Sequence, residues 1–116
     1  MAKVKYLQEL AGRLQALNMP IHYELPAPDV MEPFVVIGVS TGVSVPAKTG
    51  KAIKDDMQQI DIYLSAKAGR VAAERTLEHA VGLVGRGNSV STQLLRDDSI
   101  GRDTYHLVIR VSNYIY

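Results

Sequence analysis

The segment Gly38-Val39-Ser40-Thr41-Gly42 has the spacing G-x-S-x-G, which in serine hydrolases places a nucleophilic serine on a sharp turn between a strand and a helix. That chemistry needs a helix directly after the turn. The residues that follow lead into Pro46 and show no helical spacing. We therefore expect an ordinary turn at the end of a strand, no catalytic residue and no enzyme. Labelling of Ser40 by a serine-reactive phosphonate would contradict this expectation.

A second short motif, Thr49-Gly50-Lys51, is similar to part of a phosphate-binding loop. In such a loop backbone N–H groups and a lysine surround the phosphates, and a following Ser or Thr hydroxyl binds magnesium. Val45 stands where the first glycine is required, and Ala52 stands where the hydroxyl is required. The motif therefore predicts a solvated loop, and we expect no nucleotide or other cofactor.

The histidines and the paired carboxylates do not have the spacing of a metal or acid/base site. His22, His79 and His106 lie far apart, and no two histidines stand at the short spacing that presents both rings to one metal. We expect His79 on a helix surface and His106 at the surface or in an interface. Asp55-Asp56 and Asp97-Asp98 are adjacent pairs, and neighbours on a strand point to opposite faces. No metal site is expected.

Residues 41–54 form a basic stretch with three lysines and no acidic residue. Such a stretch could contact phosphates in a salt-sensitive manner, contact an acidic protein surface, or simply be solvated. Its apolar residues could pack locally or become ordered against a partner. The candidate interface residues are Val43, Val45, Lys48, Lys51, Ile53 and Lys54.

The composition predicts one globular domain over residues 1–116, with 47% hydrophobic and 22% charged residues. The formal net charge of +1 gives no overall attraction to nucleic acid or to an anionic membrane. The absence of cysteine excludes thiol nucleophiles, disulfides and thiolate zinc sites, and suits a reducing compartment.

No signal peptide is recognisable, and the longest apolar run, Phe34 to Val39, is far below the ~20 residues of a membrane span. We expect a soluble, cytoplasmic chain.

Two stretches have apolar residues at the three- and four-residue steps of an amphipathic helix. The first starts near the N-terminus and should end near Asn18, because Asn accepts a left-handed conformation and Pro20 cannot continue a helix. The second runs from Ala66 to about Gly85, and its alanine-rich face can approach a sheet closely.

Strands are predicted at residues 21–25, 34–40, 57–64 and 89–95, and in a closing segment whose alternation buries Leu107, Ile109 and Val111 on one face. Strands 34–40 and 57–64 should pair antiparallel. Because strand 34–40 is apolar on both faces, it needs a second cover, which could be another subunit.

The segments between these elements are predicted as a proline-rich loop at 26–33, an extended loop at 41–56 and a charged turn at 96–103. The element order αβββαββ predicts an α+β fold with about five mostly antiparallel strands and two helices packed on the sheet.

With these elements in place, the chain resembles the tail-completion proteins of long-tailed bacteriophages and prophages, also called tail terminator or head-tail joining proteins. The resemblance covers nearly the whole chain and lies in hydrophobic strand patterns. They are Ile21-His22-Tyr23, Pro33-Phe34-Val35-Val36-Ile37, Gln59-Ile60-Asp61-Ile62-Tyr63-Leu64, the helical Ala72-Ala73-Glu74 and the closing Tyr105-His106-Leu107-Val108-Ile109-Arg110-Val111.

The resemblance implies a structural virion protein without catalysis, which forms a ring, commonly a hexamer, that caps the finished tail tube and joins it to the head. Its partners would be copies of itself, the tail-tube protein and a head-completion protein. The basic loop could then contact a neighbouring subunit, the tube end or DNA in the channel. It implies a location in the virion after assembly in the host cytoplasm. The alternative is a small nucleic-acid-binding α+β domain that uses the basic loop 41–56.

Overall fold

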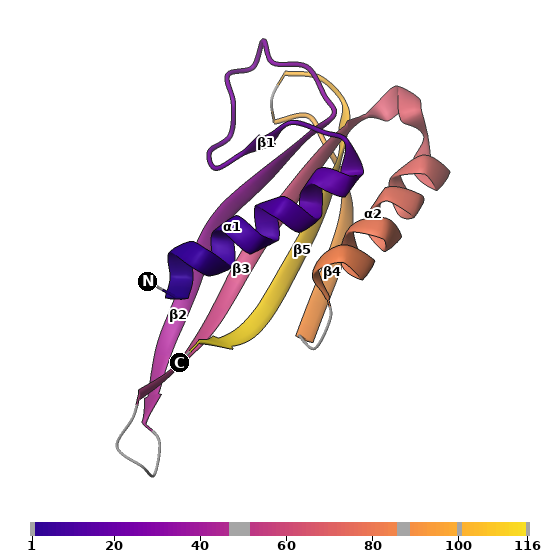
Figure 1. Cartoon of the computed structure of the whole chain (residues 1–116). Helices are drawn as coiled ribbons and strands as arrows, with labels where there is room; N and C mark the ends of the chain where they lie inside the picture. Colours follow the sequence, from indigo (N-terminus) through magenta and orange to yellow (C-terminus); the bar gives the residue numbers. More distant parts are fainter. Residues whose placement is uncertain (1, 47–51, 86–88, 100, 116) are drawn as a thin grey trace.

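The chain forms one mixed sheet with two helices packed on the same face of it (Figure 1). A computed structural model describes residues 2–46, 52–85, 89–99 and 101–115, with side chains except at 2–3, 39, 41–46, 52–56 and 113–115. The elements, in chain order, are α1 (Ala2–Leu14), η1 (Gln15–Leu17), β1 (Ile21–His22), β2 (Phe34–Pro46), β3 (Ala52–Ser65), η2 (Ala66–Ala68), α2 (Arg70–Val84), β4 (Ser89–Asp97) and β5 (Thr104–Ile115). The strand order in the sheet is β1-β2-β3-β5-β4. The predicted α+β fold and the order αβββαββ are confirmed.

The first helix ends where the sequence predicts. After α1 the chain tightens into η1, and Asn18 takes the left-handed conformation with φ 57°. The Asn18 N–H donates to the carbonyl of Gln15 at 3.0 Å, which satisfies one of the carbonyls left open at the helix end. Leu10 and Leu14, four residues apart in α1, are fully buried in the core between helix and sheet.

β1 is shorter than the predicted strand 21–25. It pairs in parallel with β2 at two positions only, Ile21 with Val35 and His22 with Val36. Tyr23 and Leu25 are more than half exposed, so no sheet face holds them, and Pro26 has no N–H for a ladder. The chain therefore leaves the sheet immediately after His22.

The prediction of an extended loop at 41–56 is wrong. β2 continues to Pro46 and β3 starts at Ala52, and the two remain paired through Val43 with Asp55 and Val45 with Ile53. Gly42 and Pro46 do not break β2 because β2 is an edge strand there among the described residues, and an edge strand tolerates such residues. The described residues 41–46 and 52–56, here called the hairpin arm, extend beyond both helices (Figure 1).

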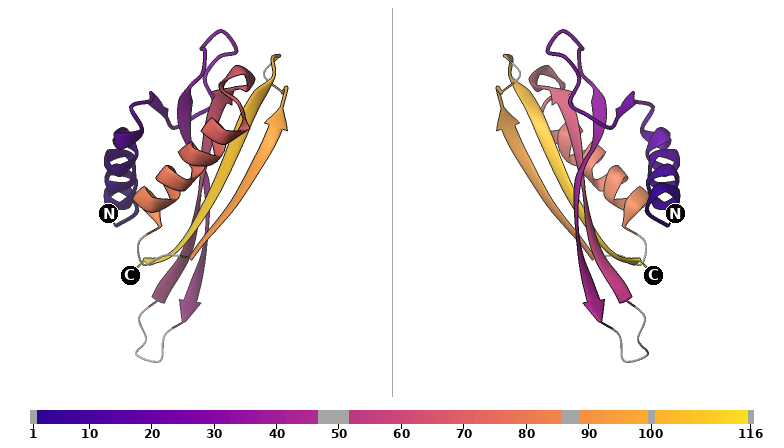
Figure 2. Two further views of the ribbon diagram at one scale, coloured as in Figure 1. Left: turned by 90° about the vertical axis from the view of Figure 1, so that its right-hand side faces the viewer. Right: turned by 90° about the vertical axis from the view of Figure 1, so that its left-hand side faces the viewer.

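The main core lies between the helices and one face of the sheet. Both side views show the two helices on that face (Figure 2). The closing strand has the predicted alternation, since Leu107, Ile109 and Val111 are fully buried in this core. α2 contributes its small residues Ala73 and Ala80, which allow the close packing that its composition predicts.

The opposite face, here called the helix-free face, has a smaller apolar cluster of Phe34, Val36 and Tyr63. Val30 of the proline-rich loop packs against this cluster. The second cover of strand 34–40 therefore comes from this chain itself at these residues, and the prediction of another subunit there is not needed.

A local irregularity in β2 is held by a buried amide. The β2–β3 register shifts between Ile37 and Ser40, as at a β-bulge, which bends a strand and increases its twist. Gln58 is 1% exposed, and its Nε2 donates to the carbonyl of Gly38 at 2.7 Å. This bond satisfies a carbonyl at the irregularity where the ladder is interrupted.

Candidate functional site

The first of the two sequence motifs with possible chemistry does not have the placement that its chemistry needs. Ser40 lies within β2, opposite Gln58, and not on a turn that leads into a helix. Gly38 is close to Asp61, because a Cβ built there would lie 3.2 Å from Asp61 Oδ2. Thr49-Gly50-Lys51 lies outside the described residues.

Three ionisable side chains meet on the helix-free face, although the sequence separates them widely. His106 Nε2 lies 2.6 Å from Asp61 Oδ1, and His106 Nδ1 lies 3.2 Å from Asp97 Oδ2. The His106 and Asp61 side chains are only 15% and 11% exposed. Gln59 Nε2 also donates to Asp61 Oδ1 at 3.0 Å. His106 is therefore mostly buried and is not a surface residue of this chain: it links β3, β5 and β4. Its place in an interface stays a prediction.

Aromatic rings continue this cluster across the sheet. His106 stacks on Tyr63 with ring centroids 4.4 Å apart, and Tyr63 stacks on Phe34 at 5.1 Å. His22 meets Phe34 edge-on at 5.9 Å. Burial, together with the negative charges of Asp61 and Asp97, raises the pKa of Tyr63 to about 12. Tyr63 therefore stays neutral and acts here as a packing residue.

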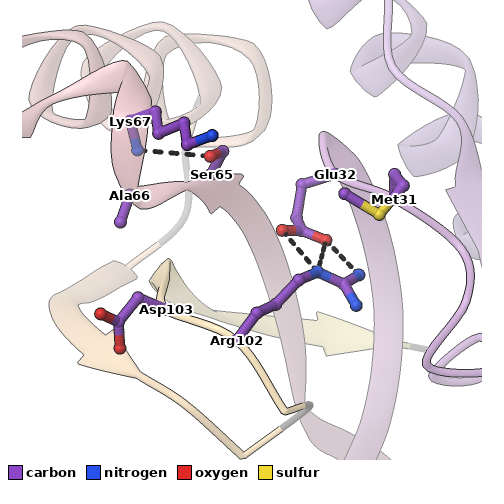
Figure 3. Close-up of a pocket in the computed structure, with 7 residues that line it drawn as sticks. All are labelled: Met31, Glu32, Ser65, Ala66, Lys67, Arg102 and Asp103. Atoms are coloured by element: carbon purple, nitrogen blue, oxygen red, sulfur yellow. Dashed lines mark hydrogen bonds and ion pairs between the residues drawn. The ribbon is translucent and has the colours of Figure 1, made fainter.

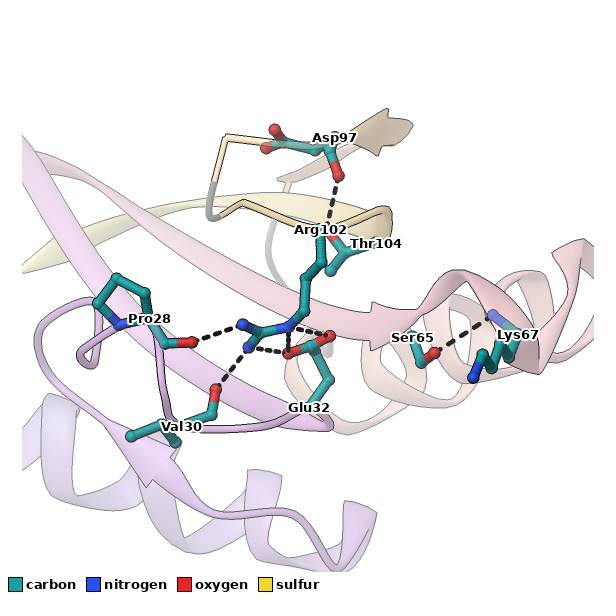
Figure 4. A network of polar contacts seen from close by, with 8 residues as sticks. All are labelled: Pro28, Val30, Glu32, Ser65, Lys67, Asp97, Arg102 and Thr104. Carbon is teal, nitrogen blue, oxygen red and sulfur yellow. Dashed lines mark hydrogen bonds and ion pairs between the residues drawn. The ribbon is translucent and has the colours of Figure 1, made fainter.

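A second polar cluster fixes the proline-rich loop to the far end of the sheet. Arg102, in the turn between β4 and β5, donates through Nε to both carboxylate oxygens of Glu32 at 3.0 and 2.8 Å, and through Nη2 to Glu32 Oε2 (Figure 4). The same guanidinium donates to the carbonyls of Pro28 and Val30. The sequence reasoning missed this contact because its partners are 70 residues apart.

A pocket of about 390 Å³ lies beside this ion pair, lined by Met31, Glu32, Ser65, Ala66, Lys67, Arg102 and Asp103 (Figure 3). The Arg102 guanidinium is turned towards Glu32 and the loop carbonyls, and the Ser65 hydroxyl accepts from the Lys67 backbone N–H at 3.2 Å. These polar groups bind one another, so we interpret the pocket as a gap beside a structural contact.

The two polar clusters, one around His106 and one around Arg102, should make the stability of the fold sensitive to acid. The Arg102 hydrogen bond holds the pKa of Glu32 below its ordinary value of 4.5, and the Ser99 backbone N–H holds the pKa of Asp97 below 3.8. A carboxylate with a lowered folded-state pKa stabilises the fold above its unfolded pKa, and this contribution is lost as the pH falls through the folded-state pKa. We expect the urea midpoint to fall steadily as the pH is lowered from about 4.5.

Glu32→Gln tests this assignment. The variant should have a lower urea midpoint than the parent at neutral pH and a shallower fall in acid, because its side chain no longer titrates. Glu9→Gln, a change of an exposed helix carboxylate, is the matched control and should retain the parent's acid slope. Equal acid slopes for parent and Glu32→Gln would contradict the assignment.

The candidate interface residues gather at the hairpin arm. Val43, Val45, Ile53 and Lys54 belong to its two strands, where Val45 pairs with Ile53 and Ser44 with Lys54. Lys48 and Lys51 lie outside the described residues. Their role in an interface stays a prediction.

The other end of the molecule carries exposed apolar side chains on the loop after β1. Tyr23, Leu25 and Met31 are 55%, 53% and 66% exposed. Exposed apolar groups that lie close together often mark a contact with another protein. Their place in a proline-rich loop is the one local signal for this exposure.

Within the described part of the chain, no group of three or more His, Cys, Asp or Glu side chains is arranged to hold a metal ion. His79 is exposed on α2, as predicted. Neither helix of the described residues has the length and hydropathy of a membrane span.

Comparison with known proteins gives a structural match without a sequence match. No protein-family model matches the sequence, and no curated protein does so. Among solved structures, a chain of the "Virion of native gene transfer agent (GTA) particle" matches with a TM-score of 0.58 and 16% identity. The match covers 94% of this chain and 91% of that chain. At this identity it shows a shared fold over nearly the full length of both chains.

Proposed function

We propose that the chain is a non-enzymatic structural protein of a virion, and that it caps the tail tube and joins it to the head as a ring, commonly of six copies. The fold shared with a chain of a gene transfer agent virion carries this proposal. The predicted resemblance to tail-completion proteins points to the same kind of role. Such a protein would be assembled in the host cytoplasm and remain in the virion, without a membrane partner.

The shape of the chain supports an assembly role. The molecule measures 53 × 26 × 22 Å, and the hairpin arm forms one end of its long axis (Figure 2). The exposed apolar loop forms the other end (Figure 1). A ring in which each copy meets two neighbours needs two different contact surfaces on one subunit. A narrow body with separate surfaces at both ends and along both sheet edges suits such a contact.

Assembly of the full chain tests the proposal. At high protein concentration, alone or with the tail-tube protein, we expect rings by electron microscopy and a matching mass by light scattering. Because such proteins can assemble only on their targets, a monomer at low concentration does not decide the matter. If no ring forms even with tail-tube protein present, the proposal is wrong.

A shortened hairpin provides the matched variant. Replacing residues 44–54 by Asn-Gly joins the paired positions Val43 and Asp55 through a two-residue turn. We expect this variant to fold with the thermal midpoint of its core but to form no ring. If this variant still forms rings, the hairpin arm is not part of the contact between copies.

The nucleic-acid alternative makes a different prediction about the same segment. Measurable duplex binding at moderate salt that is abolished by Lys48→Ala, Lys51→Ala and Lys54→Ala together would favour it. The net charge of +1 gives that alternative little support.

A further inference from the structure

The sheet has two long open edges, and we propose that they pair with each other between copies, β4 of one copy with residues 37–46 of β2 in the next. β4 ends the strand order on one side. On the other side β1 pairs with β2 only at Val35 and Val36, so within the described residues no strand covers β2 from Ile37 to Pro46 (Figure 1). This contact deepens the proposed ring and rests on the proposed assembly role.

The usual protection against pairing with another chain stands only near the ends of the two edges: Arg96 and Asp97 end β4, and the register shift between Ile37 and Ser40 and Pro46 lie at the two ends of the β2 stretch. Natural edge strands are commonly protected by charged side chains, by prolines or by short length, because their unpaired N–H and C=O groups are a template for a further strand. No charged residue occurs from Ile37 to Val45 or from Ser89 to Leu95. Both edges therefore remain competent to bind a strand.

Strand direction favours a head-to-tail contact between the two edges. β2 is antiparallel to β3, β3 to β5 and β5 to β4, so β4 runs opposite to β2 within one sheet. A neighbouring copy in the same orientation then presents β2 antiparallel to β4, which is the commoner strand pairing. Because the contact joins two different surfaces, it repeats from copy to copy until a ring closes.

The register within the sheet determines how far one copy must be offset from the next along the strand direction; this offset is called the slide. Ser89 lies at the level of Thr41, through the pairs Ser89 with Ser112, Ser112 with Met57 and Met57 with Thr41. At that level a neighbouring β4 would collide with β1. A slide of about five residues, roughly 16 Å at ~3.3 Å per residue, moves it past β1 and onto the open stretch.

This slide brings the nine residues of β4 into register with Gly38 to Pro46 of the open stretch of β2. Ser89 then stands opposite Pro46, and Ser91 stands opposite Ser44. Each copy adds the four strands β2, β3, β5 and β4 to a continuous sheet. At a spacing of ~4.8 Å these strands are about 19 Å wide. A slide of about 16 Å over that width tilts the strands by about 40° from the ring axis, within the range of closed sheets. The open edges thus agree with a closed ring in strand length and tilt.

Charge disfavours the other simple arrangement, in which β4 pairs with β4 of a two-fold related copy. A groove of about 430 Å³ runs between α2 and β4, and Glu74 and Glu78 line it. Glu74 is paired with Arg70 at 3.6 Å, so Glu78 is the carboxylate that a two-fold contact would bring towards its own copy, which is repulsive. Residues 37–54 of the chain contain no acidic residue, so pairing with β2 avoids this repulsion.

Cysteine cross-linking tests the contact directly, because the natural chain has no cysteine. The full chain with Ser44→Cys and Ser91→Cys is treated at high concentration with a short thiol–thiol cross-linker and separated on a denaturing gel. We expect a ladder of covalent oligomers that ends at the ring size, and loss of the ladder in each single variant. Ser44→Cys with Ser99→Cys is the matched control, since Ser99 is exposed in the turn beyond β4, and it should give only the single-chain band.

Two results would overturn the contact: no ladder from the double variant, or efficient dimer formation by Gln93→Cys alone, which indicates β4–β4 pairing. The same preparation viewed by electron microscopy separates the two proposals. Rings without a ladder contradict the edge contact and leave the proposed function in place. A ladder from a protein that does not bind tail tubes supports the edge contact and contradicts the tail role.

Discussion

Phe34→Ala is expected to lower the free energy of unfolding by about 3–5 kcal/mol, the cost of removing a fully buried aromatic ring. Phe34 is 1% exposed and lies between Tyr63 and His22 on the helix-free face. Its loss removes apolar burial and both ring contacts, and the sheet backbone on which it stands cannot collapse into the space. Urea unfolding followed by circular dichroism measures the change.

Phe34→Leu is the matched control for the ring contacts. It retains most of the buried apolar surface but not the stacking, so its loss should be clearly smaller, about 1–1.5 kcal/mol. Tyr23→Ala, at a residue that is 55% exposed, should change the urea midpoint little. A Phe34→Ala variant as stable as its parent would show that the small cluster on this face contributes little to folding.

His106→Leu is expected to destabilise the fold by about 3 kcal/mol, because it removes the main hydrogen-bond partner of a mostly buried carboxylate. Asp61 would keep only the hydrogen bonds from Gln59 among the contacts described above. A carboxylate that is 8% exposed and has lost its main partner is costly, since burial removes the water that would otherwise solvate it.

The double variant His106→Leu with Asp61→Val provides the decisive comparison. Val36 and Val108 are the cross-strand neighbours of Asp61, so a valine fits the position. Replacing both partners by apolar groups can be neutral, and we expect the double variant to regain most of the lost stability. Additive losses from the two single substitutions would mean that the imidazole and the carboxylate are not coupled.

The parts of the fold that the sequence predicts well are those with local causes. Asn18 and Pro20 set the end of the first helix, and the two-residue alternation of Leu107, Ile109 and Val111 defines the closing strand. Each of these signals acts within a few residues, so no knowledge of the partner strand is needed.

The hairpin arm was missed because its breakers stand on an open edge. Gly42 and Pro46 normally indicate a loop, but at an edge Pro gives up no ladder bond and Gly weakens the strand only modestly. The continued alternation of Val43 and Val45 was the better signal. Whether these residues form an interface could not be read from the sequence, since that depends on a second molecule.

The two polar clusters were missed for a different reason. His106 meets Asp61 and Asp97 only because β5 lies between β3 and β4, and Arg102 reaches Glu32 only because the β4–β5 turn lies over the proline-rich loop. One local signal existed: Asp61 is a carboxylate within an otherwise apolar strand, which is uncommon unless a partner is present.

The strand order also has a consequence for biosynthesis. β5 lies between β3 and β4 although it follows both in the chain, and all twelve of its residues pair with β3. Until Thr104–Ile115 has emerged from the ribosome, β3 and β4 have no strand between them, and the sheet cannot close. The protein must therefore fold after translation of this segment rather than during it, with the edge of β3 exposed to nascent-chain chaperones in the interval.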